Sequence, residues 1–261
     1  MNYLDKIIAS KIEELKYEKS VLSVDELKDM ISNMPPTTPF AESIRVRNGI
    51  IAEFKRKSPS KGIIHNDISP RDVVPYYEKA GVSAVSVLTN REWFGGEIKD
   101  LKDASESVGI PILRKEFIVD SYQVYEARAF GASAILLIAA VLERSQARDL
   151  AAIAKELGME VLMELHGEDE FGYIVDGVTV AGINNRNLKT FEVDLEHSVR
   201  MSRMLPDELP KISESGIRSV DDMRFLRERG GFDGFLIGEN FMCSSDPGRA
   251  CIEFCKSIDW R

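Results

Sequence analysis

Short apolar runs alternate with amphipathic segments along most of the chain. From about residue 46 onward, eight runs have the length and composition of buried strands: 49–55, 82–89, 110–117, 132–140, 159–165, 178–185, 209–215 and 232–239. Helical patterns separate them, as in 69–81, 121–131, 144–158 and 219–230. Several of these segments end in glycine, as helix C-termini often do. Strands that are apolar on both faces and alternate with helices predict a parallel βα array.

Eight such units predict closure into a (β/α)₈ barrel, the TIM-barrel fold. An open, doubly wound sheet is the alternative. It is less favoured because no G-x-G-x-x-G sequence opens the first helix and because eight units suit closure. We therefore predict one catalytic barrel over residues 46–261.

The first 45 residues have a different pattern of apolar and polar positions. Apolar residues from Leu4 to Leu15 recur at helical spacing with charges between them. Ser23 is a candidate N-cap for a second helix, and three prolines then interrupt the pattern within residues 32–40. We predict a helical extension, residues 1–45, packed on the barrel.

Polar residues occur where the predicted strands end, which is the active-site face of such barrels. Glu53 and Lys55 share one face of the first strand, because strand side chains alternate. Later strand ends carry Lys115, Glu164, Asn184, Glu214 and Ser215. The ionisable groups come from the first, third, fifth and seventh strands, and alternate strands fill one layer of a barrel interior. These side chains are therefore expected to meet at the barrel mouth.

Several explanations fit this cluster. An ion-pair network could simply close the barrel, but burying so many charges is costly without a function. Clustered lysines and glutamates shift one another's pKa values, so a lysine could act as a general acid and a glutamate as a base. A desolvated lysine could also form a Schiff base. The residue types alone do not separate the last two.

A phosphate site is predicted at the same end. Barrel enzymes often bind phosphate with the loops after strands seven and eight, which here supply Gly216 and Gly238. Ser58 and Lys61 in the first loop could add a hydroxyl group and a charge. In the loop after the second strand, Trp93 and Phe94 either cap the barrel or stack on an aromatic ligand.

Composition excludes several classes of protein. The chain has 261 residues, 44% hydrophobic and 30% charged, and its net charge of −9 argues against general nucleic-acid binding. The odd number of cysteines indicates reduced thiols rather than a disulfide framework. The three histidines are scattered, and we interpret them as structural or surface residues. No apolar signal or membrane-spanning stretch is visible, so we expect a cytoplasmic protein.

Six motifs follow one another along the chain: IIAEFKRKSPSKG, SVLTNREWFGG, PILRKEFIVDSYQVYEAR, AGINNRNL, SESGI and LIGENFM. In this order they resemble the motifs of the indole-3-glycerol-phosphate synthase family of tryptophan biosynthesis, over essentially the whole chain. The resemblance implies a carboxy-lyase that converts 1-(2-carboxyphenylamino)-1-deoxy-D-ribulose 5-phosphate into indole-3-glycerol phosphate, with loss of carbon dioxide and water. It implies no metal and no organic cofactor.

The resemblance also implies roles for individual residues. Lys115 would protonate the ribulose carbonyl, Glu164 would be a general base, and Lys55 would assist a second acid step or hold anionic groups. Glu53 and Asn184 would orient hydroxyl groups and tune the lysines. The remaining residues would complete the site: Glu214, Ser215, Gly216, Gly238, Ser58, Phe94, Trp93 and Arg186.

One residue departs from the family pattern. Glu239 follows Gly238 where a small hydroxyl residue is often found. A carboxylate facing a bound phosphate would repel it, so we expect the Glu239 side chain to point away and only its backbone N–H to make a contact.

Other proteins with this pattern stay in consideration. A phosphoribosylanthranilate isomerase would use an acid–base pair without decarboxylation, and a Schiff-base aldolase would be trapped by borohydride. A non-catalytic barrel could bind a sugar phosphate, although binding alone needs no tuned acid–base set. For partners we expect an anionic small-molecule substrate, no nucleic acid and no membrane. We expect a monomer, and association with other tryptophan-pathway enzymes is left open.

Overall fold

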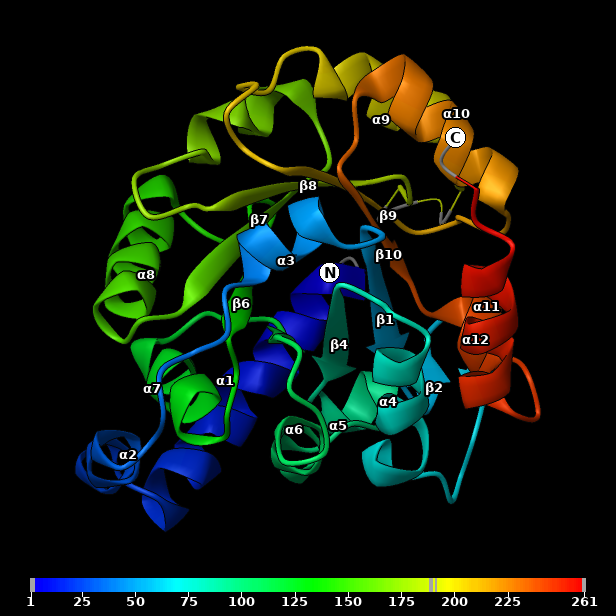
Figure 1. Ribbon diagram of the computed structural model, residues 1–261. Helices are drawn as coiled ribbons and strands as arrows, with labels where there is room; N and C mark the ends of the chain where they lie inside the picture. The colour runs from blue at the N-terminus through cyan, green and yellow to red at the C-terminus, as the bar shows by residue number, and fades with distance from the viewer. Residues whose placement is uncertain (1–2, 188–189, 191, 260–261) are drawn as a thin grey trace.

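Eight parallel strands close into a barrel in the computed structural model, which describes residues 3–187, 190 and 192–259 (Figure 1). The barrel strands are β1 (Ile50–Phe54), β4 (Ala84–Leu88), β5 (Ile112–Lys115), β6 (Ala134–Ile138), β7 (Glu160–Leu165), β8 (Val180–Asn184), β9 (Lys211–Glu214) and β10 (Gly234–Ile237). Each strand pairs with its neighbour in the chain, and β1 pairs with β10. The predicted (β/α)₈ barrel is therefore confirmed, and the open-sheet alternative is wrong.

A ring of helices surrounds the strands (Figure 1). These helices are α4 (Pro70–Lys79), α6 (Ile98–Ser105), α7 (Ser121–Ala129), α8 (Arg144–Glu156), α9 (Leu195–Ser202), α10 (Val220–Gly230) and α12 (Pro247–Lys256). The loops contain shorter elements: the hairpin strands β2 (Lys57–Ser58) and β3 (Gly62–Ile63), helices α5 (Arg91–Phe94) and α11 (Glu239–Met242), and the 3₁₀ helix η1 (Glu168–Tyr173).

The alternation of strand side chains separates two apolar layers. Ile50, Ala52 and Phe54 of β1 pack outward against the helices, whereas Ile51 lies in the barrel interior with residues of the other strands. The next inward position on β1 after Ile51 is Glu53. The same alternation thus places aliphatic groups in the barrel interior and charged groups where the strands end.

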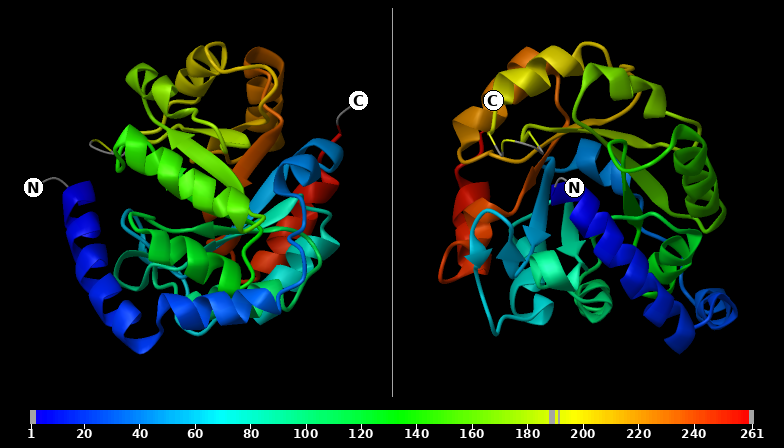
Figure 2. Two further views of the ribbon diagram at one scale, coloured as in Figure 1. Left: turned by 90° about the vertical axis from the view of Figure 1, so that its left-hand side faces the viewer. Right: turned by 180° about the vertical axis from the view of Figure 1, so that it is seen from behind.

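Opposite ends of the barrel are covered by different helices of the N-terminal segment (Figure 2). Helix α3 (Phe40–Val46) closes the end where the strands begin, with Phe40 and Ile44 in the interior core. The carboxylate of Glu160 accepts hydrogen bonds from the first backbone N–H groups of α3, at 2.8 and 2.9 Å. This helix was not predicted. It extends one residue past position 45, the expected end of the extension.

Helix α1 (Tyr3–Val21) crosses the end where the strands terminate, and α2 (Val24–Ser32) continues beside α7. Ser23 caps α2 as expected, in a reciprocal capping box with Glu26. On α1, Leu4 and Ile7 face the cavity described next. The N-terminal segment therefore contributes to both ends of the barrel.

Candidate active site

A cavity of about 460 Å³ opens at the C-terminal ends of the strands. Almost every predicted site residue lines it: Glu53, Lys55, Ser58, Phe94, Lys115, Glu164, Asn184, Arg186, Ser215, Gly216, Gly238 and Glu239. Glu214 does not line it, because this carboxylate is fully buried beneath Lys115. Trp93, the neighbour of Phe94, is also outside the described lining of the cavity.

The ammonium of Lys115 stands among three carboxylates. Its Nζ donates to Oε2 of Glu214 at 2.7 Å and lies 3.6 Å from Glu53 and 4.0 Å from Glu164. Burial favours the neutral amine, but the surrounding negative charges, that of Glu214 first, outweigh it and raise the pKa of Lys115 above its usual value. Lys115 is therefore a protonated donor at neutral pH.

Glu53 links the two lysines of the site. Lys55 donates to its Oε1 at 2.6 Å, and Lys115 lies beside its Oε2. Burial alone would raise the pKa of Glu53, but the charges of Lys55 and Lys115 lower it. The absence of a side chain at Gly238 makes room for this carboxylate, since a Cβ there would stand 2.3 Å from Oε1. Gly238 thus shapes the acid–base cluster as well as the predicted phosphate end.

Glu214 is the most enclosed carboxylate of the cluster. Burial raises its pKa to about 7, and the neighbouring charge of Glu164 adds to the effect of burial, while Lys115 opposes it. Gly182 on β8 provides the space, because a Cβ at that position would lie 2.5 Å from Oε1 of Glu214. Nothing in the sequence singles out Gly182, which resembles an ordinary strand glycine.

Glu164 has two partners on the side away from Lys115. Asn184 Nδ2 donates to its Oε1 at 2.9 Å, and Nε2 of His166 lies 3.1 Å from the same oxygen. Burial opposes ionisation, but the nearby imidazole of His166 lowers the pKa of Glu164, and the pKa of His166 is raised in return. We interpreted His166 as a structural or surface residue. The contact with Glu164 corrects this, since it brings the imidazole into the acid–base cluster.

A strained turn follows β9. Ser215 and Gly216 both have positive φ, at 72° and 76°, and Ser215 is the single described residue other than glycine with this conformation. Such backbone strain occurs mainly at functional sites. The buried Asn185 donates to the Ser215 carbonyl at 2.9 Å, and a Cβ at Gly216 would meet Val193 at 2.1 Å. The turn holds both residues against the cavity.

Basic groups surround the neighbouring part of the cavity rim. Lys61 and Arg186 lie 3.7 and 3.8 Å from the carboxylate of Glu239. Ser58 is buried beneath them, and its Oγ accepts from the backbone N–H of Lys61. We expected the side chain of Glu239 to point away from the site. This is corrected, because the carboxylate lies between two cations that line the same cavity.

Another part of the cavity lining is apolar. Phe94 on α5 and Phe117 after β5 lie with ring centroids 6.3 Å apart, and Leu4 and Ile7 of α1 complete this side of the cavity. The cavity thus has an aromatic end, a central acid–base cluster and a basic rim. Phe117 and the two α1 residues were not predicted as site residues. For Leu4 and Ile7 the reason is that only the folded chain shows that α1 reaches the cavity.

Two features are absent from the described residues. Neither the acid–base cluster nor any other part of them contains three or more histidine, cysteine, aspartate or glutamate residues arranged to hold a metal ion. Among the described helices, none combines the length and apolar character needed to cross a membrane. The three cysteines are free thiols, and Cys251 and Cys255 both lie on helix α12.

A family model and two relatives similar to this chain carry the same description. A family model described as indole-3-glycerol phosphate synthase matches residues 4–254. A protein of that name from Bacteroides thetaiotaomicron is 44% identical, with 98% of each chain covered. Another from Neisseria gonorrhoeae is 43% identical over 94% of this chain and 96% of its own.

Among solved structures, the thiamine phosphate pyrophosphorylase from Pyrococcus furiosus is similar in fold, with a TM-score of 0.57 and 15% identity. The similarity covers 79% of this chain and 93% of that one. Identity this low supports the barrel fold alone. The family assignment rests instead on the match over nearly the whole sequence: the chain belongs to the indole-3-glycerol phosphate synthase family.

Proposed function

We propose that this protein closes the pyrrole ring of 1-(2-carboxyphenylamino)-1-deoxy-D-ribulose 5-phosphate and releases indole-3-glycerol phosphate, carbon dioxide and water. The observation that carries the proposal is the environment of Lys115, an ammonium group held among three carboxylates between an aromatic wall and a basic rim. An enzyme of this family needs a proton donor at this point of the cavity.

The cavity suits the two ends of this substrate. The carboxyphenyl ring fits the apolar end beside Phe94 and Phe117, where aromatic side chains favour stacking or edge contacts. The phosphate fits the other end, near Arg186, Ser58 and the backbone of Gly216. A substrate bound across this length would bring its carbonyl group to the acid–base cluster in the middle.

In the first step, the ring carbon that bears the carboxylate attacks the ribulose carbonyl. Lys115 gives a proton to the carbonyl oxygen as the new carbon–carbon bond forms. The electrons of the bond to the carboxylate then return to the ring, and carbon dioxide leaves. The ionised carboxylate of Glu214, which accepts a hydrogen bond from Nζ at 2.7 Å, orients Lys115 for this transfer.

Dehydration converts the closed five-membered ring into the pyrrole ring of the indole. The new hydroxyl group leaves as water after receiving a proton, and a base removes a proton from the neighbouring carbon, so that the indole double bond forms. We assign the base to Glu164 and the second acid to Lys55, which Glu53 holds at 2.6 Å. Asn184 orients Glu164 through its 2.9 Å hydrogen bond.

The pKa directions favour this chemistry over the Schiff-base alternative. A lysine that forms a Schiff base needs a lowered pKa, so that the free amine is available. Lys115 has the opposite shift, because the nearby carboxylates stabilise its ammonium form. The same shift keeps Lys115 protonated at neutral pH, which is the form that a general acid requires.

The test is the fluorescence of indole-3-glycerol phosphate formed from the carboxyphenylamino substrate. We expect turnover by the wild-type chain and a loss of about 10²- to 10⁴-fold in Lys115→Met, since a general acid contributes on this scale. Lys102→Met is the matched control, because this lysine is exposed on α6. Equal turnover in Lys115→Met would contradict the assignment of the acid. No product from folded wild-type protein would contradict the reaction itself.

We further infer that the protein is active as a monomer, the state expected from the sequence. A sedimentation measurement at the assay concentration tests this inference. A species larger than 29.3 kDa that carries all the activity would contradict it.

A further inference from the structure

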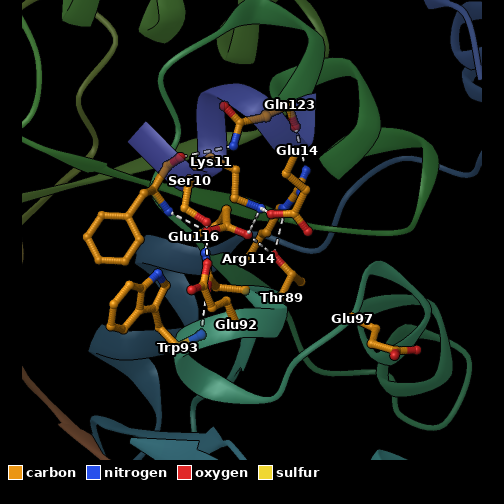
Figure 3. A network of polar contacts seen from close by, with 12 residues as sticks. Ser10, Lys11, Glu14, Thr89, Glu92, Trp93, Glu97, Arg114, Glu116 and Gln123 are labelled. Carbon is orange, nitrogen blue, oxygen red and sulfur yellow. Dashed lines mark hydrogen bonds and ion pairs between the residues drawn. The ribbon is translucent and has the colours of Figure 1, made fainter. Parts of the chain in front are cut away.

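Glu116 is a buried carboxylate in the lining of the cavity, outside the acid–base cluster around Lys115 (Figure 3). Its two oxygens accept hydrogen bonds from Asn90 Nδ2 at 3.2 Å, Thr89 Oγ1 at 3.1 Å and the backbone N–H of Phe117 at 2.9 Å. A fourth partner is Lys11, whose Nζ lies 3.0 Å from Oε2. A buried carboxylate needs such partners to offset the loss of water, and this one has them on several sides.

Lys11 comes from α1, more than 100 residues away in the sequence. Its side chain is only 1% exposed, and its ammonium also pairs with Glu14 on the same helix (Figure 3). A lysine this deeply buried is rare unless it is paired. The same helix brings Leu4 and Ile7 to the cavity. The Lys11–Glu116 pair is therefore an attachment point of α1 on the barrel.

Each partner of Glu116 belongs to an element that forms a wall of the active site. Glu116 itself stands between Lys115, the proposed acid, and Phe117, which lines the aromatic end. Asn90 caps α5 by accepting a hydrogen bond from the Trp93 backbone, and α5 carries Phe94. One carboxylate thus ties the end of β5, the start of α5 and α1 to a common point.

We propose that Glu116, held by Lys11, is a positioning residue for the reaction. It fixes the end of β5 relative to α5 and α1, so that the Lys115 ammonium and the aromatic wall keep the geometry the ring closure needs. Misplacement of a catalytic group by about 1 Å can cost about 100-fold in rate. This inference rests on the role of Lys115 in the proposed function.

The test separates positioning from simple stabilisation. The variants are Lys11→Met, Glu116→Gln and the two combined, with Lys16→Met as the control, since Lys16 is an exposed lysine of α1 paired with Glu13. For each, kcat, KM and the urea midpoint of unfolding are measured. Each single variant leaves one charge buried without its partner, which lowers stability, whereas the double variant removes both charges and should regain most of the lost stability.

If the Lys11–Glu116 pair positions Lys115, stability and turnover should respond differently to the substitutions. The single variants should lose about 10- to 100-fold in kcat, with a smaller change in KM. The double variant should regain its midpoint yet keep the low kcat, no lower than that of the poorer single variant. If a single variant does not fold, the kcat of the double variant alone tests the proposal.

Recovery of wild-type kcat in the double variant would overturn the proposal, because the pair would then only stabilise the fold. Unchanged kcat in folded single variants would overturn it as well. In both cases the wild-type chain and Lys16→Met still turn over, so the proposed function stands. No turnover by the wild-type chain would contradict the proposed function, and this inference with it.

Discussion

Nε2 of His166 lies 3.1 Å from Oε1 of Glu164, and both side chains are largely shielded from water. The two groups stabilise each other's charged form, so the pKa of the carboxyl is lowered and that of the imidazole is raised. When protonated, the imidazole is a third cation in the acid–base cluster beside the two lysines. It then favours the ionised form of Glu164 close to the negative charges of Glu53 and Glu214.

The pair should contribute a stability that depends on pH. The pKa of Glu164 is lowered from 4.5, so its contribution is present above that value and is lost as the pH falls through the folded pKa. The pKa of His166 is raised from 6.5, so its contribution is full below 6.5 and is lost as the pH rises through its folded pKa. Between these two values both contributions are present.

His166→Gln should therefore destabilise the protein more at pH 5.5 than at pH 9. At the lower pH we expect a loss of about 1 to 3 kcal/mol in the free energy of unfolding, the scale of a hydrogen bond to a charged group. Urea titrations of both proteins at the two pH values give the comparison. A difference that does not depend on pH would show that the imidazole is neutral in the folded chain.

Glu214 should determine the acid limb of the pH–rate profile. Its pKa is about 7, and only its ionised form accepts the hydrogen bond of the Lys115 ammonium without competition from its own proton. We expect kcat/KM to rise with pH through a value near 7 and this limb to disappear in Glu214→Gln. The variant also removes a negative charge beside Lys115, so the alkaline limb should move to lower pH. An acid limb retained in the variant would assign it to another group.

The barrel could be predicted because strands and helices have different periods in the sequence. The charged positions Glu53 and Lys115 could also be grouped in advance, because alternation along a strand and alternation of strands around a barrel are both geometric rules. Helix α3 could not be predicted. It has seven residues, follows a run of prolines, and is capped by Glu160, which lies about 120 residues further along the chain.

The partners of the predicted groups were harder to find than the groups themselves. His166, Gly182 and Lys11 act on Glu164, Glu214 and Glu116, and each relationship depends on how segments pack rather than on a local motif. One signal was present in the sequence. Arg114 and Glu116 flank Lys115 at outward positions of an otherwise apolar strand, which indicates a buried ion-pair network behind the strand.

Gly182 should be intolerant of a methyl group. A Cβ at this position would lie 2.5 Å from Oε1 of Glu214 and 3.0 Å from Leu162, so the carboxylate would have to move away from Lys115. We expect Gly182→Ala to lose about 10-fold or more in kcat, together with about 1 to 3 kcal/mol of stability from overpacking. Gly109→Ala is the control, since its Cβ would meet nothing closer than 3.5 Å. Wild-type kcat in Gly182→Ala would mean that the cluster tolerates a shift of Glu214.

Glu239 should weaken the binding of anions at the basic rim. Its carboxylate lies 3.7 and 3.8 Å from Lys61 and Arg186, distances at which partly exposed pairs contribute about 1 kcal/mol or less. A phosphate near the same cations would displace this weak pairing and be repelled by the carboxylate. Glu239→Gln should therefore bind inorganic phosphate about 3- to 10-fold more tightly, and the gain should shrink as salt is added.

Calorimetric titration of phosphate into Glu239→Gln and wild type measures this effect. Glu156→Gln makes the same change in net charge at an exposed position of α8, so it separates a local effect from the overall charge. Tighter binding in both variants would point to net charge alone. Equal affinity in Glu239→Gln and wild type would mean that the carboxylate turns to solvent when an anion arrives, the orientation expected from the sequence.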